Sequence, residues 1–153
     1  VYMLKSFPGN LRKDVQAHGA TVVDVVEPLQ ICENVYSTGE MGTQVEEQSL
    51  IIHTVKGSVV ITGCAHPGII QIVEKSNELA KQDLLLVMGG FHLLDKTVSE
   101  VESIISRFRE LGVFYAASCH CTGDAAIGLF SEAYRDKFID IGAGKVISID
   151  DLN

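Results

Sequence analysis

The chain has 153 residues, a formal net charge of -8 and an apolar content of 46%. This length supports one domain, residues 1–153, with its own hydrophobic core, and is too short for two domains of ordinary size. Acidic residues outnumber basic ones, and no run of Lys and Arg is long enough to follow a phosphate backbone. The composition therefore argues against nucleic acid as a nonspecific partner.

Nothing in the sequence points to a membrane. The longest apolar run, residues 84–88, is far shorter than the roughly 20 residues of a spanning helix. Residues 1–5 lack the charged region, the apolar stretch and the cleavage site of a signal peptide. We therefore expect a cytoplasmic protein without a membrane partner.

The first half of the chain predicts short elements of mixed type. In chain order these are a helix at 11–17, a strand at 21–26, a loop at 38–44, and strands at 48–55 and 58–62. Gly19 is a stop signal for the helix. The dipeptide Lys56-Gly57 between the two later strands predicts a hairpin.

The second half of the chain alternates strands with helices. The expected elements are helices at 68–81, 97–111 and 124–134, a buried strand at 84–88, and strands at 113–118, 138–141 and 146–149. Thr97 and Glu100 form a capping box, and Gly112 is a C-terminal stop for the same helix. This alternation predicts an α/β layered fold.

Three histidines stand in similar places, just after a predicted strand. His66, His92 and His120 each lie in a loop that also holds glycine or cysteine. If the intervening helices make these strands parallel, their carboxyl ends share one edge of the sheet, where open α/β sheets place their sites. We therefore predict that the three imidazoles meet there and ligate a metal, and we assign no further catalytic or cofactor-binding residue.

Neutral imidazole binds several divalent metals, so zinc is expected first, with iron or manganese as alternatives. The other two histidines have simpler interpretations. His18 lies at a helix end and is expected to cap it or to face solvent, and His53 within a strand is expected to be structural. The acidic pair Glu46-Glu47 is expected to be a solvated face or a strand edge.

The four cysteines are expected to be reduced, buried or half-buried thiols: Cys32, Cys64, Cys119 and Cys121. The C-x-C pair around His120 differs from the C-x₂-C spacing of zinc ribbons and ferredoxins. A redox or iron–sulfur role for Cys64, Cys119 and Cys121 stays open as a weaker alternative.

Several stretches resemble the metallo-β-lactamase superfamily and, more narrowly, its dihydropterin–ribofuranosylaminobenzene-phosphate synthase-like branch. They are EQSL at 47–50, TGCAHPGI at 62–69, GGFHL at 89–93 and HCTG at 120–123, together with KSFPG at 5–9. The resemblance implies an αββα sandwich with a one- or two-metal site at the sheet edge. By this comparison His66 completes the ligands of a first metal and His120 binds a second. His92 falls near the usual bridging aspartate, as a ligand or a substrate contact.

One motif of that superfamily is missing. The string H-x-H-x-D-H, which carries most of the metal ligands in the first half of the fold, does not occur here. The chain thus resembles a C-terminal half, a mixed sheet with flanking helices. The other half is then removed by truncation, supplied by a separate chain, or lost from the gene. Because half a sandwich exposes the inner face of its sheet, we expect a homo-oligomer or association with the missing half.

The resemblance implies a metal-dependent hydrolase or transferase acting on a small molecule, either a phosphate ester or a pterin-type compound. Without the H-x-H-x-D-H ligands, the chain on its own is expected to be inactive. The alternative is a noncatalytic half-domain that oligomerises or binds a ligand. The sequence identifies neither the substrate nor the metal.

Overall fold

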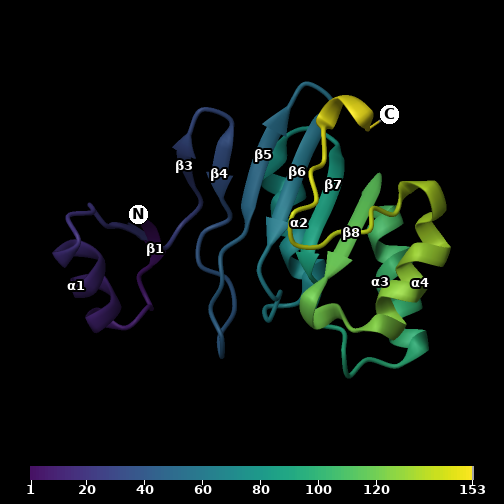
Figure 1. Ribbon diagram of the computed structural model, residues 1–153, viewed down its shortest axis with the longest axis horizontal. Coiled ribbons are helices and arrows are strands. Elements are labelled where there is room, and N and C mark those ends of the chain that lie inside the picture. Colours follow the sequence, from purple (N-terminus) through teal and green to yellow (C-terminus); the bar gives the residue numbers. More distant parts are fainter. Residues whose placement is uncertain (153) are drawn as a thin grey trace.

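The computed structural model describes residues 1–152 and contains two sheets of unequal size (Figure 1). The strands are β1 Tyr2–Leu4, β2 Val23–Val25, β3 Leu29–Cys32, β4 Val35–Ser37, β5 Leu50–Thr54, β6 Gly57–Thr62, β7 Leu84–Gly90 and β8 Tyr115–Cys119. β1 and β2 form a parallel pair, and β3 to β8 form a six-stranded sheet in sequence order. That residues 1–153 make one domain stays a prediction.

Four α-helices accompany the sheets. They are α1 Gly9–Ala17, α2 Ile69–Ala80, α3 Val98–Glu110 and α4 Asp124–Tyr134. Two short 3₁₀ turns follow β8 and α4, at His120–Thr122 and Arg135–Lys137, and a third lies near the end of the C-terminal coil, at Ile149–Asp151. Within residues 1–152 no helix combines the length and the apolar character needed to cross a bilayer.

The large sheet is mixed. Its strands are antiparallel from β3 to β6, whereas β6, β7 and β8 are parallel to one another. The two parallel connections are made by α2 and α3, as expected for strand–helix–strand units. The expectation of parallel strands is confirmed, so the loops after β6, β7 and β8 leave the sheet at the same edge.

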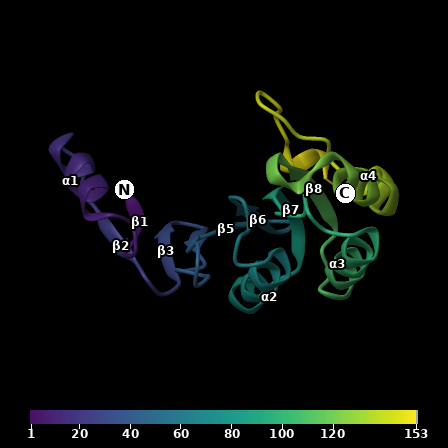
Figure 2. The ribbon, with the colours of Figure 1, turned by 90° about the horizontal axis from the view of Figure 1, so that it is seen from below.

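Helices cover one face of this sheet. Figure 2 shows α2 and α3 on one side of β6 to β8, with α4 beside α3. Between them Phe91, Phe108 and Phe130 form a fully buried triangle, with ring centroids 5.3 to 5.4 Å apart. Edge-to-face and tilted ring pairs at this spacing add to the stabilisation from apolar burial.

The predicted ends of α3 are confirmed. The Glu100 carboxylate accepts a hydrogen bond from the Thr97 backbone N–H at 2.8 Å, and the Thr97 hydroxyl accepts one from the Glu100 N–H at 3.3 Å. The hydrogen bonds from Thr97, and then Lys96, lower the pKa of Glu100 to about 2. Gly112 follows the helix with a φ of 76°, which suits glycine.

A coil, residues 138–152, covers the opposite face of the sheet (Figure 2). Its apolar side chains pack on Val59, Leu86 and Tyr115, and they come from Ile139, Ile141, Ile147, Ile149 and Leu152. The strands predicted at 138–141 and 146–149 are therefore wrong. Beside β8 the coil pairs at a single isolated bridge, between Ala116 and Phe138, within the described residues. Strand propensity alone does not make its other residues pair with β8.

The first part of the chain departs further from the sequence-based expectation. α1 ends at Ala17 as predicted but begins two residues earlier, at Gly9, and it has no buried residue. The β3–β4 hairpin was not expected; it turns at Glu33 and Asn34, and Asn34 has a φ of 62°. The β5–β6 hairpin is confirmed, with Thr54 paired to Gly57, so its turn lies one residue earlier than predicted.

Candidate metal centre

The three predicted histidines lie in the loops after β6, β7 and β8, and all three are exposed. His66 and His92 are direct neighbours, with ring centroids 4.5 Å apart. His120 instead groups with two thiols: one ligand atom each of Cys64, His120 and Cys121 lies within 4.8 Å of the others. The structure therefore brings the histidines to one edge as two neighbouring groups.

The backbone of these loops is held in an unusual conformation. Ala65, His92 and His120 have φ values of 62°, 52° and 53°, in the left-handed region that favours glycine. Two of the histidines themselves, and not only the glycines beside them, adopt this conformation. Each imidazole therefore leaves the chain at a sharp turn rather than from a strand.

Glycine is also required where β7 ends. A Cβ at Gly89, which has a φ of 130°, would collide with the Thr62 carbonyl oxygen. A Cβ at Gly90 would lie 2.7 Å from both Cys121 Sγ and the Gly63 carbonyl oxygen. These two glycines let the three loops approach one another closely.

Glu47 orients His66. Its carboxylate forms a hydrogen bond with His66 Nδ1 and accepts another from the Ala65 backbone N–H at 2.9 Å. Its side chain is 15% exposed and its backbone forms a bridge with Met41, so for Glu47 the expected solvated face is wrong and the alternative, a strand edge, agrees with the structure. A carboxylate on one imidazole nitrogen is the usual partner of a metal-binding histidine, and it leaves Nε2 free as a ligand.

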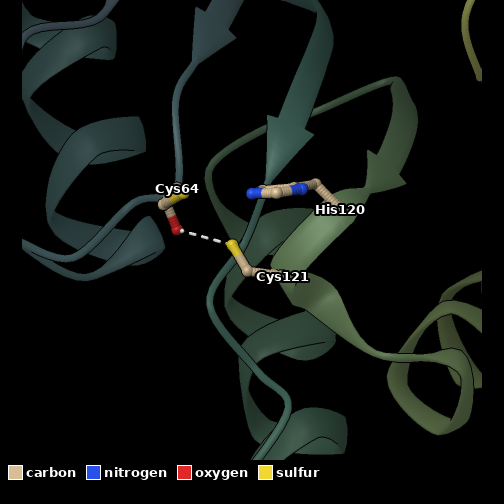
Figure 3. A group of neighbouring side chains, drawn as sticks. All are labelled: Cys64, His120 and Cys121. Carbon is tan, nitrogen blue, oxygen red and sulfur yellow. Dashed lines mark hydrogen bonds between the residues drawn. The ribbon is translucent and has the colours of Figure 1, made fainter.

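Cys64, His120 and Cys121 form a second group (Figure 3). The imidazole of His120 extends toward Cys64, and Cys121 lies alongside and donates its thiol proton to the Cys64 carbonyl oxygen at 3.3 Å. Cys64 also belongs to a group with Glu47 and His66, whose ligand atoms again lie within 4.8 Å of one another. Cys64 thus connects the two groups.

Two of the three half-buried thiols at this edge, Cys64 and Cys119, have a raised pKa. Burial raises the pKa of Cys64, and the neighbouring Cys121 thiol and Glu47 carboxylate raise it further. Burial, then Cys121, also raises the pKa of Cys119. All four cysteines are free, as predicted, but Cys32 is exposed, so the expectation of a buried or half-buried thiol is wrong for it. The sequence offered Cys64, Cys119 and Cys121 only as a weaker redox or iron–sulfur alternative, because Cys64 and Cys121 stand 57 positions apart.

The donor set suits a divalent metal of borderline or soft character. Imidazole nitrogen, thiol sulfur and carboxylate oxygen are the ligands that zinc and ferrous iron take in proteins. Next to it, a surface hollow of about 480 Å³ is lined by His66, His92, Gln71 and the loop 42–45. This hollow offers room for a small molecule beside the imidazoles.

The remaining histidines have the structural positions that were expected. His18 caps the end of α1, and its Nδ1 lies 2.9 Å from the Asp14 carbonyl oxygen. His53 Nδ1 lies 2.9 Å from the Ser58 hydroxyl, and its ring packs on Tyr36. Neither lies in the metal-ligand groups found within the described residues.

No family model matches this chain. Among curated proteins it is similar to the 7,8-dihydropterin-6-methyl-4-(β-D-ribofuranosyl)-aminobenzene-5'-phosphate synthase of Methanocaldococcus jannaschii, with 29% identity over 90% of this chain and 56% of the synthase. An uncharacterized protein of that organism is 34% identical over 60% of this chain and 34% of its own length. The chain thus spans little more than half of the synthase and about a third of the second relative.

A solved structure gives the same picture. The chain superposes with a TM-score of 0.74 on Tm1679, described as a metal-dependent hydrolase of the β-lactamase superfamily. Their sequences are 32% identical, and the match covers 84% of this chain and 59% of the other. The resemblance to the metallo-β-lactamase superfamily and its dihydropterin synthase-like branch is confirmed, and so is the fold class, a mixed sheet with flanking helices.

Proposed function

We propose that the sheet edge with His66, His92 and His120 supplies ligands for a divalent metal in a hydrolase or transferase reaction on a phosphate ester or a pterin-type compound. The observation that carries the proposal is the convergence of three loops from parallel strands on one edge, with the Glu47 carboxylate already placed on His66. The similar proteins, a metal-dependent hydrolase and a dihydropterin phosphate synthase, support the same chemistry.

Each residue has a distinct part in this proposal. Glu47 fixes the tautomer and direction of His66, so that Nε2 is the ligand atom. His92 contacts the His66 ring and borders the hollow of about 480 Å³, where it serves as a ligand or a substrate contact. A divalent metal bound here would polarise a phosphoryl oxygen and lower the pKa of a water molecule. Zinc is the metal we expect, with iron or manganese as alternatives.

Metal content tests this proposal most directly. Purified chain, supplemented with zinc or manganese and freed of excess ion, should retain metal when measured by inductively coupled plasma mass spectrometry. His66→Gln should retain less, because the imidazole is lost. His18→Gln is the matched control, since His18 is exposed on α1 far from this edge along the chain. A parent chain that retains no metal, or an equal loss in both variants, contradicts the proposal.

A chromogenic phosphodiester adds a test of reactivity. The chain spans 56% of the synthase and lacks the string H-x-H-x-D-H, so we expect the chain alone to turn the ester over slowly or not at all. Adding the remaining half of a relative, as a separate chain, should raise the rate. Metal binding without any turnover in that mixture would favour the noncatalytic, ligand-binding alternative.

We also propose that the chain associates, with a second copy or with a separate partner half. The supporting observation is the run of exposed apolar side chains in and around α1, β1 and β2: Val1, Tyr2, Phe7, Leu11, Val23 and Val26. β1 and β2 are paired, so these side chains lie on neighbouring elements, and exposed apolar side chains that gather on a surface are typical of interaction sites. Sedimentation velocity over a range of concentrations should show a dimer or larger species, and a monomer throughout would contradict self-association.

A further inference from the structure

We propose that Cys64, His120 and Cys121 form a thiolate-containing metal site at this edge, with two sulfur ligands and one imidazole, next to the group that holds His66. This inference rests on the proposed function, which places a metal at the same edge, and it names the ligands and the class of metal. It differs from the set of three histidines predicted by the sequence. Only His120 is common to both sets.

The spacing of the donor atoms fits a single ion. The thiol sulfurs of Cys64 and Cys121 and a nitrogen of His120 all lie within 4.8 Å of one another. Two sulfurs on one tetrahedral zinc ion, each at about 2.3 Å from it, are about 3.8 Å apart. The required closure is therefore within the reach of side-chain rotation, without movement of the backbone.

The backbone around Cys121 is firmly held. The buried Thr122 hydroxyl donates to the Cys119 carbonyl oxygen at 2.6 Å and accepts from the Phe91 N–H at 3.1 Å. The Cys121 carbonyl oxygen accepts from the Leu93 N–H at 3.2 Å. The 3₁₀ turn at His120–Thr122 is therefore hydrogen-bonded to the loop after β7 at two points, Phe91 and Leu93. A preformed ligand loop lowers the entropic cost of binding an ion.

Gly90 keeps the two thiols together. A side chain at this position would occupy space within 2.7 Å of Cys121 Sγ and 3.2 Å of the Cys64 Cα. Because position 90 has no Cβ, the two cysteine-bearing loops meet directly across it. The short distance between the two cysteine-bearing loops thus depends on the glycine at the end of β7.

The exposure of the group indicates a site that substrate can reach. Both cysteines are half-buried and His120 is exposed. Three protein ligands with one solvent-facing side are typical of catalytic zinc sites, whereas structural sites are closed by four. Thiolates also select zinc, cobalt or ferrous iron over manganese and magnesium, which narrows the metals that the histidines alone would accept.

Cobalt substitution tests this ligand set without relying on activity. Reduced chain titrated with Co²⁺ in the absence of oxygen should develop a near-ultraviolet thiolate-to-cobalt charge-transfer band. Zinc should abolish the band by displacement, and manganese or magnesium should leave it unchanged. Cys64→Ser and Cys121→Ser should each weaken the band, and the double variant should remove it. Circular dichroism checks that each variant is folded.

Two other cysteines provide matched controls. Cys32 is exposed on β3, and Cys119 is a neighbour of the site outside the proposed ligand set. Cys32→Ser and Cys119→Ser should retain the full band. A band that depends on Cys119, or that persists in the Cys64→Ser, Cys121→Ser double variant, overturns the proposal.

The remaining outcomes separate this inference from the proposed function. If the folded, unsubstituted chain binds cobalt but shows no charge-transfer band, the thiolate site is overturned and a histidine-bound metal is left intact. If the reduced chain binds no cobalt at all, both proposals fail. In that case the state of the thiols in air is also informative. A stable disulfide that reforms between Cys64 and Cys121 would assign the pair to redox chemistry.

Discussion

The two faces of the six-stranded sheet are covered in different ways. On one face three amphipathic helices pack around Phe91, Phe108 and Phe130. On the other face the irregular coil 138–152 supplies single apolar side chains, and Val146 within it is 85% exposed. The helices are specified by their own periodic pattern, whereas the coil depends on what lies beside it. The first cover is therefore expected to be rigid and the second to be adaptable.

Removal of a ring from the helix-covered face should have the largest effect. Phe108→Ala leaves a cavity among rigid neighbours and should lower the free energy of unfolding by about 3–5 kcal/mol. Phe7→Ala is the control, since Phe7 is 39% exposed and its loss should cost well under about 1 kcal/mol. Urea denaturation followed by circular dichroism measures both. Equal losses would refute a tightly packed triangle.

A matched pair on β7 compares the two faces directly. Leu84 and Leu86 are each 1% exposed, but Leu84 packs under the helices and Leu86 under the coil. Leu→Ala costs about 2–5 kcal/mol, and less where the surroundings collapse into the cavity. We expect Leu84→Ala near the upper end of this range and Leu86→Ala near the lower end, in the same urea experiment. The reverse order would show that the coil is the more rigid cover.

The cap of α3 should contribute less than either core position. Thr97→Ala removes one half of the capping box and should lower the free energy of unfolding by about 1 kcal/mol. Ser103→Ala, on the exposed side of the same helix, serves as the control and should change it by less than about 0.5 kcal/mol. Thermal unfolding of the two variants would distinguish these values. No difference between them would argue against a stabilising cap.

Tyr134 should have the smallest effect at neutral pH and a distinct effect in alkali. Burial raises the pKa of Tyr134 to about 12 from an ordinary value of 10.0. Between these values the unfolded chain loses the proton and the folded chain keeps it, so this contribution to stability is present below pH 10 and is lost as the pH rises to about 12. Tyr134→Phe should lose less stability over that interval, measured as the shift in urea midpoint. An unchanged pH dependence would contradict this.

The sequence predicts best the elements that carry their own boundary residues. The bounds 124–134 of α4 are those of the structure, because Gly123 with a φ of 80° ends the preceding turn and an apolar stripe follows. The capping box set the start of α3 in the same way. By contrast β3 and β4 have only four and three residues, which is too short for a period-two pattern to stand out in the sequence.

The failures at the site have a similar cause. Each histidine could be selected because a strand and a glycine-bearing loop stand beside it in the sequence. Glu47 and Cys64 meet His66 and Cys121 only through pairing of strands, across 19 and 57 positions. In the coil, residues 138–141 and 146–149 have strand propensity, but only neighbours in space decide whether they pair.

The turns at His92 and His120 have a consequence for anyone who would stabilise this protein. In the left-handed region a non-glycine residue costs about 1–2 kcal/mol, so glycine is the residue that the backbone alone would prefer at both positions. A search for stabilising substitutions would therefore choose the two positions where the imidazoles leave the chain. At this sheet edge, a substitution to glycine that raises thermostability would remove an imidazole.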